Sequence, residues 1–150
     1  MELKNALLSL DKLFAKRKIS YCVTGTAAFM LLGFPQISYP GDIDIKVYGL
    51  TEEQRKWLEE LELLADILPG NPEYKQECYT ITVKGYKVNV IVSKELLNDT
   101  LQLAIPCGPT HGHLIEVESV EKAIFEKAKL NREKDVRYLL KLIKWLSSLL

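Results

Sequence analysis

Residues 19–48, ISYCVTGTAAFMLLGFPQISYPGDIDIKVY, contain a glycine turn, a short helix and two aspartates in close succession. ISYCVT is rich in β-forming residues and ends at Gly25, and TAAFMLLG is typical of a short helix that a glycine terminates. FPQISYPG has two prolines and predicts a loop. DIDIKVY alternates strictly, which predicts a strand with Ile43, Ile45 and Val47 on one face. The segment therefore indicates the order strand, turn, helix, loop, strand.

The same alternation puts Asp42 and Asp44 together on the other face of that strand, with their side chains about 7 Å apart. Two carboxylates so placed repel each other unless a cation lies between them. Oxygen ligands of this kind suit Mg²⁺, which binds through one or two carboxylates together with phosphate oxygens. Gly25 and Thr26 lie where a strand turns into a helix, and a helix N-terminus directs backbone N–H groups at an anion such as phosphate. Taken singly, the aspartates also fit a solvent-facing strand and Thr26 a helix N-cap, and only the combined order is specific.

The rest of the chain completes an α/β pattern. Lys84-Gly85 separates two β-rich runs and predicts a hairpin with a tight turn. Four further helices are predicted, at 2–17, 51–64, 119–130 and 132–150, with Thr51 and Ser119 as the N-caps of the second and third. One or two short strands are predicted around a Pro/Gly loop within 101–117. We therefore expect an α/β (α+β) fold in a single domain over 1–150, a mixed β-sheet flanked by helices, with a helical C-terminus (about 119–150) packing on it.

Length and composition agree with one globular domain. The chain has 150 residues, with 20 acidic and 20 basic side chains, so no overall field draws it to nucleic acid or to an anionic membrane. The N-terminal stretch carries charges among its leucines, and no apolar run approaches the roughly 18 residues of a membrane-spanning helix. Three widely spaced cysteines are unlike a disulfide framework. These features predict a soluble, cytoplasmic protein that does not enter a membrane.

On these motifs the chain resembles the nucleotidyltransferase superfamily, the polymerase-beta-like fold. Its signature is a hydrophobic strand, Gly-Gly/Ser, a helix and then Asp-x-Asp/Glu. TGTAAFMLLG and GDIDI resemble the Gly-Thr-Ala helix and the paired carboxylates of small bacterial and archaeal members, which include toxin-type nucleotidyltransferases. FEKAKLNREKDVRYLLKLI resembles their C-terminal helices. The resemblance covers Ile19 to Tyr48, and the hairpin and C-terminal helices more loosely.

The resemblance implies Mg²⁺-dependent transfer of a nucleoside monophosphate from a nucleoside triphosphate such as ATP to an acceptor, which would be RNA, a protein or a small molecule. Gly25 and Thr26 would bind the triphosphate, and Asp42 and Asp44 would hold two magnesium ions that bridge it. The third carboxylate of the family lies on a later strand, which here is YKVNVIVS, and its position falls on Asn89. Asparagine carries no charge and cannot act as a base near neutral pH. On sequence alone it also fits a polar residue on a half-exposed strand.

Two functional classes therefore stay open, an enzyme and a non-catalytic nucleotide-binding or regulatory module, and either fits a toxin–antitoxin pair. Lys127, Arg132 and Lys134 are candidates for binding triphosphate or nucleic-acid phosphates. The same residues also fit a solvated helix face, and Lys134-Asp135 also fits a structural ion pair.

Two further features have competing interpretations. Cys107, His111 and His113 form a C-x3-H-x-H cluster that would bind zinc with one more ligand, or else belong to an ordinary loop. The last helix is apolar on more than one face, which predicts burial on more than one side. The first helix would cover one side, and a second copy of the chain in a homodimer or a partner protein the other, unless all of it is buried within the chain. The residues concerned are Leu139, Leu140, Leu142, Ile143, Trp145, Leu146, Leu149 and Leu150.

Overall fold

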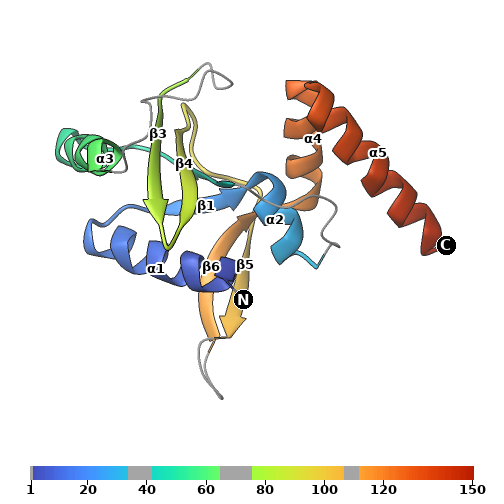
Figure 1. Cartoon of the computed structure of the whole chain (residues 1–150), viewed down its shortest axis with the longest axis horizontal. Coiled ribbons are helices and arrows are strands. Elements are labelled where there is room, and N and C mark those ends of the chain that lie inside the picture. The colour runs from blue at the N-terminus through green and yellow to red at the C-terminus, as the bar shows by residue number, and fades with distance from the viewer. Residues whose placement is uncertain (1, 34–41, 65–75, 107–111) are drawn as a thin grey trace.

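The computed structural model describes residues 2–33, 42–64, 76–106 and 112–150, which form a mixed sheet flanked by helices (Figure 1). This confirms the predicted α+β fold with a helical C-terminus. The described elements, in chain order, are α1 (Glu2–Lys16), β1 (Tyr21–Thr24), α2 (Gly25–Leu31), β2 (Asp42–Val47), α3 (Glu52–Leu64), β3 (Cys78–Val83), β4 (Tyr86–Val92), β5 (Thr100–Pro106), β6 (Gly112–Glu118), α4 (Val120–Leu130) and α5 (Glu133–Ser148).

The six described strands are arranged in the order β3-β4-β2-β1-β6-β5. β2 pairs with β4 and β1 pairs with β6 in parallel, whereas the other neighbours are antiparallel. The β3–β4 hairpin therefore lies directly beside β2. In this register Asn89 is the partner of Asp44 on β2 and also of Thr80 on β3.

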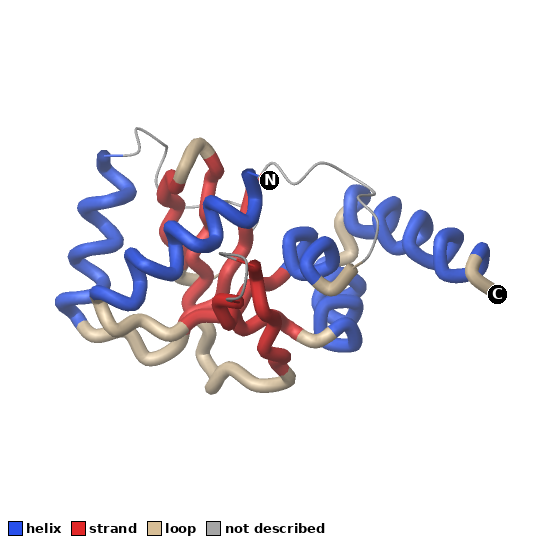
Figure 2. Tube along the Cα trace, turned by 90° about the horizontal axis from the view of Figure 1, so that it is seen from below, coloured by secondary structure: helices blue, strands red, loops and turns tan. Residues whose placement is uncertain are grey.

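Alternation along β2 separates the hydrophobic core from the polar face. Ile43, Ile45 and Val47 are fully buried in the main core, together with the apolar stripe of α1 and two alanines of α2. α3 packs beside β3, at the end of the molecule opposite to α4 and α5 (Figure 2). The side chains of Asp42 and Asp44 alternate with the core residues, so they lie on the other face of the sheet.

The helix caps and the hairpin turn that the sequence predicts are present in the structure. The Thr51 Oγ1 accepts a hydrogen bond from the Gln54 backbone N–H at 3.1 Å, and the Gln54 side chain accepts from the Thr51 N–H at 2.8 Å, which is a reciprocal capping box. Lys84 and Gly85 have φ of 50° and 82°, the left-handed pair that a two-residue hairpin turn requires. Ser119 Oγ caps α4 by accepting the N–H three residues on at 3.3 Å.

The packing of α5 differs from the prediction. α1 packs against the sheet and not against α5. Instead, α5 packs on α4 and on Phe29 of α2 through Tyr138 and Leu142. Leu140 and Ile143, on the outer face, are 61% and 58% exposed, so burial of the whole helix within the chain is also wrong. α5 extends away from the sheet in both views (Figures 1 and 2). Cover by a second copy or by a partner protein stays a prediction.

The predicted loop at 34–41 lies outside the described residues. Among the helices of the described segments, none combines the length and the apolar character needed to cross a membrane.

Candidate functional site

The polar face of β2 carries Asp42, Asp44 and Lys46, each partly buried. Their spacing of two residues puts all three side chains on one side of the sheet. α2 leads from the adjacent strand β1 and packs against β2, so the start of this helix lies next to the carboxylates. The glycine turn and the aspartates therefore lie side by side, because β1 and β2 are paired with Thr24 opposite Asp44.

Asn89 connects the two carboxylates. Its side-chain Nδ2 donates to Asp42 Oδ2 at 3.1 Å and to Asp44 Oδ1 at 2.9 Å. The Asn89 side chain reaches both because β4 runs parallel to β2 in register. On its other side, Asn89 Oδ1 accepts a hydrogen bond from Thr80 Oγ1 at 3.0 Å. The residue is only 2% exposed, so its amide is enclosed by these partners.

Gly25 lies close to Asp44, in a backbone conformation that favours glycine. Its backbone has φ +68°, and a Cβ placed on it would lie 3.0 Å from Asp44 Oδ2. Both the left-handed conformation and the short distance require glycine here. Thr26 lies in the first turn of α2, and the N-cap of that helix is Thr24. The turn therefore lies directly beside Asp44.

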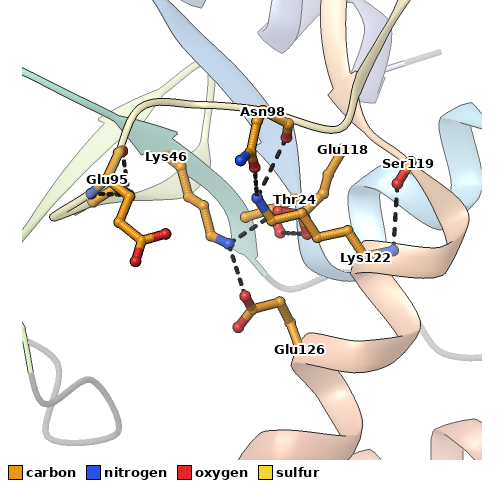
Figure 3. A network of polar contacts seen from close by, with 9 residues as sticks. Thr24, Lys46, Glu95, Asn98, Glu118, Ser119, Lys122 and Glu126 are labelled. Carbon is orange, nitrogen blue, oxygen red and sulfur yellow. Dashed lines mark hydrogen bonds and ion pairs between the residues drawn. The ribbon is translucent and has the colours of Figure 1, made fainter.

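Glu118 joins this face of the sheet, and the sequence did not indicate it. Its carboxylate accepts from Thr24 Oγ1 at 2.6 Å and from Lys46 Nζ at 2.9 Å, and its side chain is 1% exposed (Figure 3). Glu126 of α4 lies 3.5 Å from the same Lys46 Nζ. Thr24 and Glu118 are 94 residues apart. No short-range pattern links them, and the parallel pairing of β1 with β6 brings them together.

The Lys46 ammonium is held in its charged form. Burial by itself lowers the pKa of Lys46, but the carboxylates of Glu118 and Glu126 outweigh burial, so the pKa is raised. Lys46 therefore ties β2 to β6 and to α4, and it neutralises a carboxylate that would otherwise be buried with a net charge.

The three predicted basic residues occupy different environments. Lys127 Nζ lies 3.6 Å from Asp135 Oδ1 and 4.6 Å from the centre of the Tyr138 ring. Burial lowers the pKa of Lys127, and the negative charges of Asp135 and, after it, Asp44 oppose this shift. Arg132 binds Asp135 through Nε at 2.6 Å and through Nη2 at 3.1 Å. Lys134 lies on an exposed position of α5.

These contacts separate the candidates. The Lys127–Asp135 pair connects α4 to the start of α5, whereas Arg132 pairs with Asp135 within the first turn of α5. Of the three basic residues, Lys127 is the one whose charge interacts with Asp44. The ion partners described for Asp135 are Lys127 and Arg132.

A metal site in the described segments would have to rely on two carboxylates. No group of three or more His, Cys, Asp or Glu side chains in these segments is arranged to hold a metal ion. Asp42 and Asp44 nevertheless fit Mg²⁺, because they lie on one face of β2 and this ion binds through one or two carboxylates and completes its shell with water and phosphate oxygens. Of the predicted zinc ligands, Cys107 and His111 lie outside the described residues, and His113 contacts Asp11.

Comparison with known proteins supports the fold. No protein-family model matches the sequence, and no curated protein matches it significantly. The structure is similar to the crystal structure of an antigenic nucleotidyltransferase-like protein from Paracoccidioides brasiliensis, with a TM-score of 0.61 and 17% identity over 96% of this chain and 76% of that chain. The chain thus has a nucleotidyltransferase-like fold, which agrees with the resemblance of its motifs; at this identity the likeness concerns the fold alone.

Proposed function

We propose that the protein binds a magnesium–nucleoside triphosphate complex and transfers the nucleoside monophosphate to an acceptor. The observation that carries the proposal is the convergence of Asp42 and Asp44 beside the Gly25 turn, on a nucleotidyltransferase-like fold. Asp42 and Asp44 would hold the cation, and Gly25 and Thr26 would contact the triphosphate. The cation supplies the positive charge that orients the phosphates and stabilises the leaving pyrophosphate.

Electrostatics supports a role for Lys127. Its ammonium is largely buried between Asp135 and the Tyr138 ring, so it is held in place and little screened by water, and its charge interacts with that of Asp44. In the proposal Lys127 contacts the triphosphate. Arg132 and Lys134 are further candidates for phosphate binding, although Arg132 is already paired with Asp135.

A second candidate function follows from Asn89. By the resemblance to nucleotidyltransferases, Asn89 falls on the position of the third carboxylate of that family, and its amide cannot accept a proton at neutral pH. This favours, as the alternative, a nucleotide-binding or regulatory module that binds without turnover. Either function is compatible with a toxin–antitoxin pair and with an RNA, protein or small-molecule acceptor.

One experiment separates the two functions. The protein is incubated with Mg²⁺ and each of the four α-labelled nucleoside triphosphates, with and without RNA. Pyrophosphate release and label transfer are measured, together with triphosphate binding by calorimetry. Turnover that disappears in Asp42→Asn with Asp44→Asn supports the enzyme. Mg²⁺-dependent triphosphate binding without pyrophosphate release supports the regulatory module. If no triphosphate binds with Mg²⁺ present, both are contradicted.

A further inference from the structure

A single amide nitrogen lies between the two carboxylates of the candidate site. Asn89 Nδ2 is 3.1 Å from an oxygen of Asp42 and 2.9 Å from an oxygen of Asp44. An ionised carboxylate only accepts hydrogen bonds, so the amide group must present its NH₂ end, with its two donors, to this pair. The amide thereby offers partial positive charge at the place where two negative groups converge.

A hydrogen bond on the side away from the aspartates fixes the orientation of the Asn89 amide. Asn89 Oδ1 accepts from Thr80 Oγ1 at 3.0 Å, and both residues are buried. Thr80 is itself held on the edge strand, because its backbone N–H donates to Glu62 Oε2 of α3 at 2.6 Å. Turning the amide over would place its oxygen against two carboxylate oxygens and break both hydrogen bonds that Nδ2 donates.

This arrangement bears on how many cations the site takes. A divalent ion such as Mg²⁺ binds carboxylate oxygens at about 2.0–2.1 Å, so an ion shared by these two oxygens on the side that faces β4 would need the space that the amide nitrogen fills. We infer that the Asn89 amide takes the place of one divalent cation between Asp42 and Asp44. The chain then binds one ion fewer than it would with a carboxylate at position 89. The inference rests on the cation site of the proposed function.

Counting bound ions tests the inference without measuring activity. Mn²⁺, which suits the same oxygen ligands as Mg²⁺, is titrated into the full chain, and free Mn²⁺ is followed by electron paramagnetic resonance. Asn89→Asp should bind one more Mn²⁺ per chain than the wild type. The matched control is Asn5→Asp, which adds the same carboxylate at an exposed position of α1 and should bind as many ions as the wild type. An equal count in Asn89→Asp and the wild type overturns the inference.

The wild-type count reports separately on the proposed function. A wild-type chain that binds no Mn²⁺ at millimolar concentration contradicts a cation-dependent function. The difference between Asn89→Asp and the wild type still decides the role of the amide in that case. Failure of the function and failure of the inference are thus distinguishable.

A second variant keeps the inference falsifiable if Asn89→Asp does not fold. Asn89→Ala removes the amide and adds no charge, so Asp42 and Asp44 repel each other without compensation. Its Tm in the presence of a chelator should fall, and Mn²⁺ should raise that Tm by several degrees more than it raises the wild-type Tm. Equal Mn²⁺-induced shifts in Asn89→Ala and the wild type overturn the inference.

Discussion

At the residue scale, the site depends on a few positions where one atom more would change the geometry. Gly25 combines a left-handed backbone with a close approach to Asp44, and Asn89 holds both aspartates with one amide. Gly49 provides a useful comparison, because its backbone has a similar φ of +71° but nothing lies within 4 Å of its missing Cβ. A side chain would therefore introduce similar backbone strain at Gly25 and at Gly49, whereas only Gly25 lies beside Asp44.

Replacing Gly25 by alanine should abolish binding of the magnesium–ATP complex. The left-handed conformation costs an L-residue about 1–2 kcal/mol. The added methyl also meets Asp44 Oδ2, so the carboxylate must move. Gly49→Ala should lose similar stability and keep its affinity, as measured by calorimetry with ATP and Mg²⁺. Undiminished affinity in Gly25→Ala would mean that this contact does not shape the site.

Glu118 should stabilise the fold more than Glu126, although both contact Lys46. Glu118 is 1% exposed and Glu126 is 35% exposed. Removing one partner of a buried ion pair leaves an uncompensated charge and costs about 3–5 kcal/mol, whereas exposed pairs contribute about 0–1 kcal/mol. Glu118→Gln should therefore lower the Tm by roughly 10 °C. Glu126→Gln should change the Tm by only a few degrees in the same thermal unfolding experiment, and equal losses would contradict this ranking.

At the element scale, α5 has one face against the protein and one face towards solvent. Tyr138 and Leu142 pack with Phe29 and with Ala123 of α4 in a small second core, separate from the main one. Along the outer face Leu140 and Ile143 are more than half exposed. The helix is therefore attached to the rest of the chain by a single apolar face.

Leu142→Ala and Leu140→Ala should differ strongly in stability. Leu142 is 1% exposed and Leu140 is 61% exposed on the same helix. Truncating a buried leucine costs about 2–5 kcal/mol, because a cavity forms. An exposed position usually changes stability by about 0.5 kcal/mol or less. Urea unfolding of both variants measures the difference. A large loss in Leu140→Ala would mean that this face is covered in solution.

At the scale of the whole molecule, the proposed site combines residues attached to both cores. The aspartates and Asn89 project from strands of the main sheet, whereas Lys127 comes from α4, which packs with α5 in the second core. A nucleotide bound by groups from both parts would stabilise the folded protein, because it does not bind the unfolded chain.

ATP together with Mg²⁺ should therefore raise the thermal stability of the protein. At about 100 times the dissociation constant, a ligand stabilises the fold by about 2.7 kcal/mol, or roughly 5–10 °C for a chain of this size. Chelating the metal, or combining Asp42→Asn with Asp44→Asn, should remove the shift. The matched control is Glu59→Gln with Glu60→Gln, which removes two exposed charges from α3 and should retain the ATP-induced increase in Tm. The same ATP-induced shift with chelator and with Mg²⁺ would contradict a bridging cation.

Much of the fold and half of the site follow from short-range patterns. The alternation of DIDIKVY determines that Asp42 and Asp44 share a face, and Lys84-Gly85 determines the hairpin turn, because side-chain periodicity and backbone conformation are properties of neighbouring residues. Thr51 likewise marks the start of α3 through its own hydrogen bonds.

Tertiary structure decided the remainder. The parallel pairing of β2 with β4 brings Asn89 to aspartates 45 and 47 residues away, and β3 then adds Thr80 behind the amide. Glu118 contacts Thr24, 94 residues away, because β1 pairs with β6. Likewise, α5 packs against α4 and not against α1. These contacts depend on the order and direction of strands in the sheet, and residue periodicity along one segment contains no information about which distant segment will lie beside it.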